Sequence, residues 1–145
     1  MQTIRLVYSS ESVGGLAYGD FLTIMDRAAR TNTAQSITGI LCYGSGHFLQ
    51  ALEGDRSVVN ALYHRIALDP RHDACELLRV EEITTRDFAE WSMRIVNWDD
   101  AGSAGQRAAL LKNSGSSEFD PRQMSGAQAT TFLRDLANMQ RMLAE

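Results

Sequence analysis

Alternation of apolar and polar residues predicts two β-strands whose inward faces each hold a polar side chain. Over residues 2–9 the two-residue period places Tyr8 among aliphatic neighbours, and over residues 47–53 it places Gln50 among apolar neighbours. A buried amide group without hydrogen-bond partners costs about 1–3 kcal/mol, and a buried tyrosine hydroxyl also needs a partner. The pattern therefore predicts a small polar pocket in the core, in which Gln50 and Tyr8 are candidates to meet.

The rest of the pattern up to residue 98 predicts the element order βαββαββ. One amphipathic helix ends near Asn32, and a second begins at the N-cap residues Asp55 and Ser57 and ends at Asp69-Pro70. The predicted strands cover residues 2–9, 37–43, 47–53, 76–84 and 92–98, the last with Trp91, Met93 and Ile95 on one face, and Gly44-Ser45-Gly46 joins the second to the third as a hairpin. This order predicts an α+β fold of the ferredoxin-like kind, with two helices on one face of a mostly antiparallel sheet.

The C-terminal part of the chain is predicted to cover the other face of the sheet. That face also carries apolar residues, among them Val7, Leu49, Ala51 and Val96. Residues 104–112 and 127–143 have helical periodicity, and a Gly- and Ser-rich stretch at 113–117 links them. We therefore expect one domain at residues 1–99 and a helical extension at residues 100–145.

Composition and charge exclude several classes of function. A net charge of −4 with scattered basic residues does not suit a nucleic-acid-binding surface. No stretch is long and apolar enough for a membrane span, and Cys42 and Cys75 lie in apolar runs as expected of small buried residues rather than disulfide partners. We expect a cytoplasmic protein that contacts neither nucleic acid nor a membrane.

The sequence also lacks the usual catalytic signatures. No GxSxG, GxGxxG or GxxxxGK[ST] pattern occurs, and His47, His64 and His72 lack the spacing of metal ligands. We expect no enzymatic activity and no bound metal.

Each polar candidate also has an ordinary structural explanation. Asp69 lies at a helix C-terminus, where its charge is unfavourable, but Asp-Pro can begin a turn and Arg65 can pair with it. Asn32 can be a left-handed helix cap, and Tyr8 and Gln50 can be core residues that satisfy each other. Residue types and spacing leave these alternatives open.

Taken together, the same residues resemble the BLUF family of flavin-binding blue-light sensors. The resemblance covers about residues 2 to 98, with Tyr8, Asn32 and the ITG and FLQxLEG motifs in register. It rests on Arg5-Leu6-Val7-Tyr8-Ser9-Ser10, Asn32, Ile37-Thr38-Gly39-Ile40-Leu41-Cys42-Tyr43, Phe48-Leu49-Gln50-Ala51-Leu52-Glu53-Gly54, Tyr63-His64-Arg65-Ile66, Asp69-Pro70-Arg71-His72 and Trp91-Ser92-Met93.

The resemblance implies a flavin, FAD with FMN as the alternative, held between the two helices. Ile24 and Ile66 would clamp the ring faces, and Asn32 would bind the polar edge of the ring. Gln50 would bridge the ring to the Tyr8 hydroxyl. Four residues would lie toward the ribityl and phosphate end: Arg65, Asp69, Arg71 and His72. An apolar slot with charges at one end suits such a ligand.

The resemblance also implies the photochemistry. Tyr8 would lose an electron and a proton to the excited flavin, and Gln50 would relay the proton because its amide both donates and accepts. Afterwards the Gln50 amide would remain rotated or tautomerised, the flavin absorption would shift to the red, and the last strand would respond through Trp91 and Met93. Whether these two residues face inward or outward is disputed in the family, and the sequence leaves both placements open.

This sequence departs from common family choices on the first helix, where Ala28 and Thr31 replace polar residues that often contact the flavin edge. Too few residues follow Asp100 for an ordinary enzyme domain. By resemblance to short BLUF proteins, we expect a homo-oligomer that exchanges a separate signalling partner, of which a response-regulator-like protein is one kind. The alternatives are a light-independent interaction module of the same fold and, in third place, a flavin enzyme.

Overall fold

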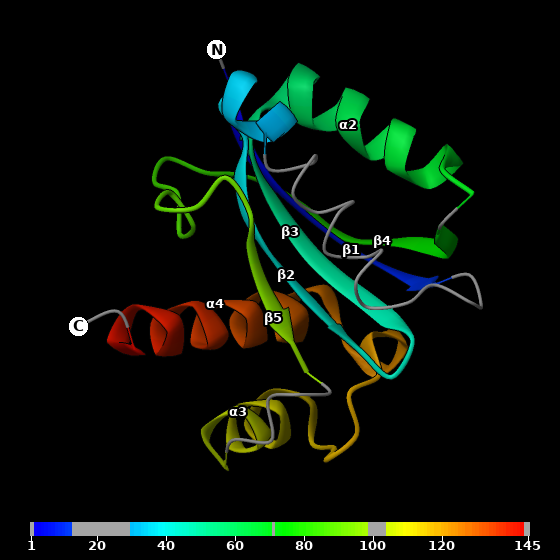
Figure 1. The fold of residues 1–145 in the computed structure, drawn as a ribbon, viewed down its shortest axis with the longest axis vertical. Helices are drawn as coiled ribbons and strands as arrows, with labels where there is room; N and C mark the ends of the chain where they lie inside the picture. Colours follow the sequence, from blue (N-terminus) through cyan, green and yellow to red (C-terminus); the bar gives the residue numbers. More distant parts are fainter. Residues whose placement is uncertain (1, 13–29, 71, 99–103, 144–145) are drawn as a thin grey trace.

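A five-stranded sheet forms the centre of the part of the chain that the structure describes (Figure 1). The structure is a computed structural model, and it describes residues 2–12, 30–70, 72–98 and 104–143. The strands are β1 (Thr3–Ser12), β2 (Thr38–Gly44), β3 (His47–Asp55), β4 (His72–Glu82) and β5 (Arg94–Asn97); the helices are α2 (Arg56–Leu68), α3 (Ala104–Ser114), the short 3₁₀ helix η1 (Pro121–Gln123) and α4 (Gly126–Leu143). Residues 30–34 are also helical.

The strand order β4-β1-β3-β2-β5 confirms the predicted ferredoxin-like arrangement. β3 pairs with β1 and β2 in antiparallel ladders, β4 pairs with β1 in the same sense, and only the short β5 pairs in parallel, with β2. Gln50 therefore lies in the centre of the sheet, as predicted. The hairpin between β2 and β3 turns at Ser45 and Gly46, whose φ angles of 51° and 78° suit a tight turn that follows the strand twist.

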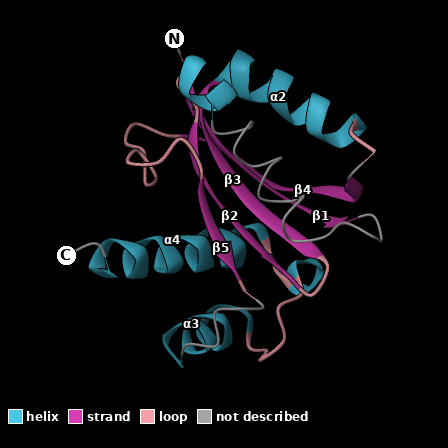
Figure 2. Ribbon diagram, viewed as in Figure 1, coloured by secondary structure: helices cyan, strands magenta, loops and turns pink. Residues whose placement is uncertain are grey.

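Helices pack on both faces of the sheet, as Figure 2 shows. One face and α2 enclose a core that includes Ile4, Leu6, Leu41, Leu52 and Val59. The opposite face is covered by α3 and α4, whose inward residues pack on the sheet residues Val7, Leu49, Ala51 and Val96. The prediction that the C-terminal helices cover this second face is confirmed.

The structure corrects three local predictions. The fourth strand begins at His72 rather than Glu76. Asp55 occupies the N-cap position of α2 but makes no side-chain cap bond, because the Ser57 hydroxyl donates to its carboxylate instead. The expected shared face of Trp91, Met93 and Ile95 is wrong: Met93 and Ile95 pack in the α2-side core, whereas Trp91 packs in the opposite core. Trp91 and Met93 precede the strand, so the alternation of a pleated strand does not govern them.

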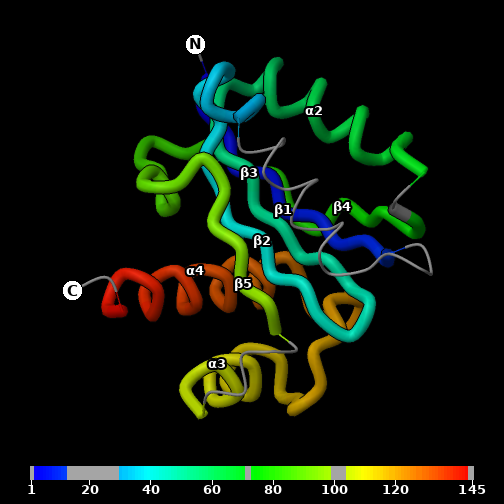
Figure 3. Tube along the Cα trace, in the orientation of Figure 1, coloured from blue at the N-terminus to red at the C-terminus, as the bar shows by residue number. Residues whose placement is uncertain are grey.

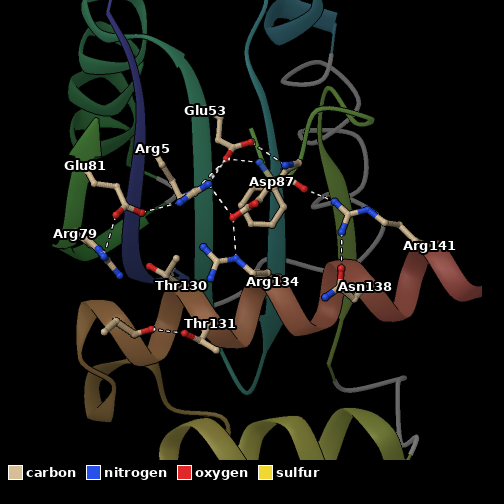
Figure 4. Close-up of polar contacts among 12 residues, drawn as sticks. Arg5, Glu53, Arg79, Glu81, Asp87, Thr130, Thr131, Arg134, Asn138 and Arg141 are labelled. Carbon is tan, nitrogen blue, oxygen red and sulfur yellow. Dashed lines mark hydrogen bonds and ion pairs between the residues drawn. The ribbon is translucent and has the colours of Figure 1, made fainter. Parts of the chain in front are cut away.

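A buried ion network lies under α4, on the face opposite α2 (Figure 4). Arg5 of β1 and Glu53 of β3 are 4% and 0% exposed and form an ion pair at 2.9 Å. Arg5 also pairs with Glu81 at 2.6 Å and with Asp87 at 2.8 Å. Glu53 further accepts the backbone N–H groups of Asp87 and Phe88 at 3.0 and 2.8 Å. Burial lowers the pKa of the Arg5 guanidinium, but Glu53, Glu81 and Asp87 raise it by more, so the charge is retained.

Replacing Glu53 with Ala should strongly destabilise the fold. The change leaves the Arg5 charge buried without its most buried partner and leaves two backbone N–H groups without an acceptor. We expect a loss of about 3–5 kcal/mol in the free energy of unfolding, measured by urea denaturation in the dark. The control is Lys112→Ala, which removes a solvent-exposed partner of Asp135 and should cost less than about 1 kcal/mol. Equal costs for the two variants would contradict the importance of the network.

Candidate functional site

The centre of the candidate site is a hydrogen bond between side chains of neighbouring strands. Tyr8 of β1 and Gln50 of β3 are directly opposite in the antiparallel ladder. Their exposed fractions are 1% and 5%, and the Tyr8 hydroxyl donates to the Gln50 Oε1 atom. The polar pocket predicted from the sequence is thus present, and its two predicted members are in contact.

Met93 completes the environment of the Gln50 amide. The Gln50 Nε2 atom donates to the Met93 Sδ atom at 3.2 Å. Met93 is 9% exposed and belongs to the core under α2, so it faces inward. A thioether sulfur is a weak acceptor, which leaves this N–H group able to gain energy from a stronger acceptor. The Gln50 amide is therefore held firmly at its oxygen and loosely at its nitrogen.

Asn32 lies in the same region with an unused acceptor. It is 2% exposed, and its Nδ2 atom donates to the backbone carbonyl of Ser92 at 3.1 Å. Among the described residues, its Oδ1 atom is buried and has no hydrogen-bond partner. An unpaired buried carbonyl oxygen costs free energy, so the arrangement suits a ligand that donates a hydrogen bond to it. A mere helix cap, the ordinary explanation for Asn32, does not account for this oxygen.

Gly39 of β2 allows the segment that carries Met93 to approach the sheet. A Cβ atom at Gly39 would come within 2.1 Å of the Ala51 carbonyl oxygen and within 3.2 Å of the Met93 Cε atom. The Gly39 N–H group donates to the Trp91 carbonyl at 3.1 Å. Sequence reasoning did not assign Gly39 or the Ser92 carbonyl to the site. Glycine inside a strand is a recognised signal of close approach, whereas a backbone carbonyl leaves no signal in the sequence.

Burial keeps the Tyr8 phenol protonated. Desolvation raises its pKa well above the ordinary value for tyrosine, with smaller contributions from nearby Cys75 and Tyr63. Tyr63 of α2 lies with its ring centroid 5.4 Å from that of Tyr8, and burial raises its pKa as well. At neutral pH, Tyr8 is therefore a neutral O–H donor toward Gln50.

The other residues expected at the site are distributed along and beyond α2. Ile66 is half-buried and packs on the α2-side core, Arg65 is exposed in the last turn, and Asp69 is the C-cap residue. His72 is the first residue of β4. Ile24 and Arg71 lie outside the described residues, as does Ala28, and Thr31 is exposed. The structure thus brings together Tyr8, Gln50, Asn32 and Met93, while Trp91 lies on the other side of the sheet.

The hydrogen-bonding groups of Asn32 and Gln50 fit the polar edge of a flavin ring and do not resemble a metal site. The orphaned Asn32 oxygen can accept from a ring N–H group, and the Gln50 N–H group can donate to a ring nitrogen or carbonyl oxygen. Within the described ranges, no group of His, Cys, Asp and Glu side chains could hold a metal ion. No helix in those ranges is both long and apolar enough to span a bilayer.

Curated relatives share this region of the chain. The chain is 37% identical over 89 residues to the photoactivated adenylate cyclase subunit beta of Euglena gracilis, which covers 61% of this chain and 10% of the relative. It is 35% identical over 68 residues to the blue light- and temperature-regulated antirepressor BluF of Escherichia coli (strain K12), covering 47% of this chain and 17% of the relative. Because the match spans only about a tenth of the cyclase subunit, its cyclase activity does not transfer to this chain.

Solved structures match nearly the whole chain, including α3 and α4. BlsA in its photo-activated state superposes with a TM-score of 0.82 at 28% identity and covers 93% of this chain and 94% of its own. The dark state of BlrB, a BLUF protein, superposes with a TM-score of 0.75 at 31% identity, covering 95% and 97%. The BLUF family profile, described as "Sensors of blue-light using FAD", matches residues 3–94. The chain therefore belongs to the BLUF family of FAD-binding blue-light sensors.

Proposed function

We propose that this chain is a blue-light photoreceptor in which the Gln50 amide is the switch. The observation that carries the proposal is the contact of Gln50 with Tyr8 on one side and Met93 on the other, beside the orphaned oxygen of Asn32. A polar constellation of this kind in an apolar core costs free energy unless it has a function or a ligand.

Residues from several elements would hold the flavin. Asn32 and Gln50 would bind the polar edge of the ring, and Ile66 would pack on one face, with Ile24 on the other. Arg65, Asp69, Arg71 and His72 would lie toward the ribityl and phosphate end. The places of Arg65, Asp69 and His72 at the end of α2 and the start of β4 support this part of the proposal, because these three described residues follow one another at one end of the helix.

Bound FAD, or FMN as the alternative, supplies the absorption of blue light and a strong oxidant in the excited state. Tyr8 would then give up an electron together with its hydroxyl proton. Gln50 would pass the proton on, since its carbonyl oxygen accepts from Tyr8 and its N–H group donates. When the electron and proton return, the Gln50 amide would be left rotated or tautomerised, with the hydrogen bonds of the ring edge rearranged and no net chemical change.

The output would be a change in protein–protein contacts. Met93 loses or exchanges its bond with the Gln50 amide when that amide changes state, and Met93 directly precedes β5. We propose that the contact of β5 with α3 and α4 changes as a result, and that this alters self-association or the binding of a separate signalling protein, for example one like a response regulator. The proposed function is therefore sensing and not catalysis.

The main alternative, a light-independent interaction module, explains less of the site. In such a module Tyr8 and Gln50 would simply satisfy each other, as they do at the Gln50 oxygen. It gives no reason for the unpaired Asn32 oxygen or for an amide N–H group directed at a methionine sulfur.

Replacing Gln50 with Leu should retain flavin binding and abolish the photoresponse. The native chain should show oxidised flavin absorption bands that shift reversibly to the red in blue light, whereas the variant lacks the amide that rearranges. The matched control is Gln123→Leu, which alters an exposed glutamine of η1 and should keep the shift. A colourless native protein that takes up no flavin would refute the sensor, and a persistent shift in the Gln50 variant would refute the role of that residue.

The Tyr8 phenol should remain protonated in alkaline solution. Because burial raises its pKa in the folded state, the unfolded chain loses this proton first as the pH rises. The contribution of Tyr8 to stability is thus complete below about pH 10 and decreases above it. At about pH 10.5, folded native and Tyr8→Phe proteins should give the same tyrosinate absorbance. In denaturant the variant should instead lack the signal of one of the four tyrosines. A difference between the two folded proteins would contradict the shielded phenol.

Blue light should change the self-association or partner binding of the native chain. Size-exclusion chromatography in the dark and under blue light, with and without candidate partners, measures this directly. The Gln50→Leu protein is the control and should elute identically under both conditions. Identical profiles for the illuminated native protein in all mixtures would contradict the proposed output.

A further inference from the structure

The segment that connects β4 to β5, residues 83–93, contacts Gln50 and Asn32 close to where it contacts α4. Three consecutive residues near its end have different partners: Trp91 lies on the α4 side, the Ser92 carbonyl binds Asn32, and the Met93 sulfur binds Gln50. Figure 3 shows this connection on the side of the sheet where α4 ends. Met93 is therefore only two residues from Trp91, whose side chain packs in the core beneath the C-terminal helices.

Two consecutive residues of α4 bind the chain on both sides of Met93, Arg141 within this segment and Gln140 at the first residue of β5. The Gln140 Oε1 atom accepts from the Arg94 Nε atom at 3.0 Å. The Arg141 guanidinium donates to the Glu90 carboxylate and to the Asp87 carbonyl, and it lies over the Trp91 ring at 5.2 Å from the centroid. We call this set of residues, Gln140 and Arg141 with Glu90, Trp91 and Arg94, the α4 latch.

A second contact between α4 and the same segment is built differently. Arg134, two turns earlier on α4, pairs with the Asp87 carboxylate at 2.8 Å (Figure 4). Asp87 is itself held by the buried Arg5 and, through its backbone N–H group, by the fully buried Glu53. This contact is anchored in the sheet through Arg5 and Glu53, so a shift of Met93 leaves it in place.

The ion pair of the α4 latch, unlike the buried anchor of Asp87, is partly open to solvent. Arg141 and Glu90 are 33% and 47% exposed, and ion pairs of such exposure contribute little to stability. Opening the latch requires that Arg141 release Glu90, Trp91 and the Asp87 carbonyl and that Gln140 release Arg94. The α4 latch is weak and lies next to Met93, whose bond with Gln50 would respond to light. The Arg134–Asp87 contact is firm. This combination has the properties of a two-state element.

We propose that light opens the α4 latch and frees the last turn and a half of α4, residues 138–143, while the Arg134–Asp87 contact keeps the rest of the helix in place. The inference rests on the proposed function and specifies how it is regulated. The freed turns carry Met142 and Leu143, which are 73% and 78% exposed, and Met139, which packs on the core beneath α4. Light would thus change the surface that α4 presents to a partner.

Hydrogen exchange of the flavin-loaded, full-length chain tests the inference. In the native protein, the backbone amides of residues 138–143 should exchange about tenfold faster in blue light than in the dark. Arg141→Ala should show the fast rate already in the dark and no further change in light, while its flavin red shift is retained. Lys112→Ala, which removes a cation from α3 without touching residues 83–93, should behave like the native protein.

A charge exchange distinguishes the latch from a general loss of packing. The double variant Glu90→Arg with Arg141→Glu restores the ion pair in reverse, but not the bond to the Asp87 carbonyl or the contact with Trp91, and should recover part of the slow dark exchange that Arg141→Ala loses. If hydrogen exchange of residues 138–143 in the native protein is the same in light and dark while the flavin absorption still shifts to the red, the latch is refuted and the proposed photoreceptor function stands. Slow dark exchange in Arg141→Ala would also overturn it. Absence of any flavin shift in the native chain would overturn the latch together with the proposed function.

Discussion

The register of the β1–β3 ladder is the constraint on which the rest of the structure depends. It sets Tyr8 opposite Gln50 on the α2 side and Arg5 opposite Glu53 on the α4 side. Because side chains alternate along a strand, a slip of one residue would reverse both faces and separate both pairs at once. One backbone alignment thus holds the Tyr8–Gln50 pair in one core and the ion network in the other.

The buried polar groups of the two cores differ in how completely their hydrogen bonds are satisfied. The Arg5–Glu53 pair is satisfied on every side by Glu81, Asp87 and backbone N–H groups, so it has one favourable arrangement and is rigid. The Gln50 amide has a strong partner at its oxygen and a weak one at its nitrogen. The weak bond at the nitrogen can be exchanged at small cost for one to a stronger acceptor, which supports the proposed role of this amide as a switch.

The C-terminal helices form a layer of the same fold and not a separate body. Phe132 of α4 contacts Trp98, which follows β5, and Phe119, which precedes η1, with ring centroids 5.9 and 6.1 Å apart. These three rings join the end of β5 to α4 and to the link that precedes η1. The superposition with BlsA and BlrB over more than nine tenths of the chain shows that these helices are part of the architecture shared with those structures.

The sequence alone determined the order of the elements, the two apolar faces of the sheet and the meeting of Tyr8 with Gln50, because these follow from side-chain periodicity and from the need to pair buried polar groups. The tertiary structure decided what lies outside regular strands. Trp91 and Met93 separate to opposite cores because the bend between them ends the alternation, and Asn32 reaches the Ser92 carbonyl across a long separation in sequence. The α4 latch was likewise beyond prediction, since long exposed side chains such as Arg141 choose partners by proximity in space, and periodicity carries no information about that.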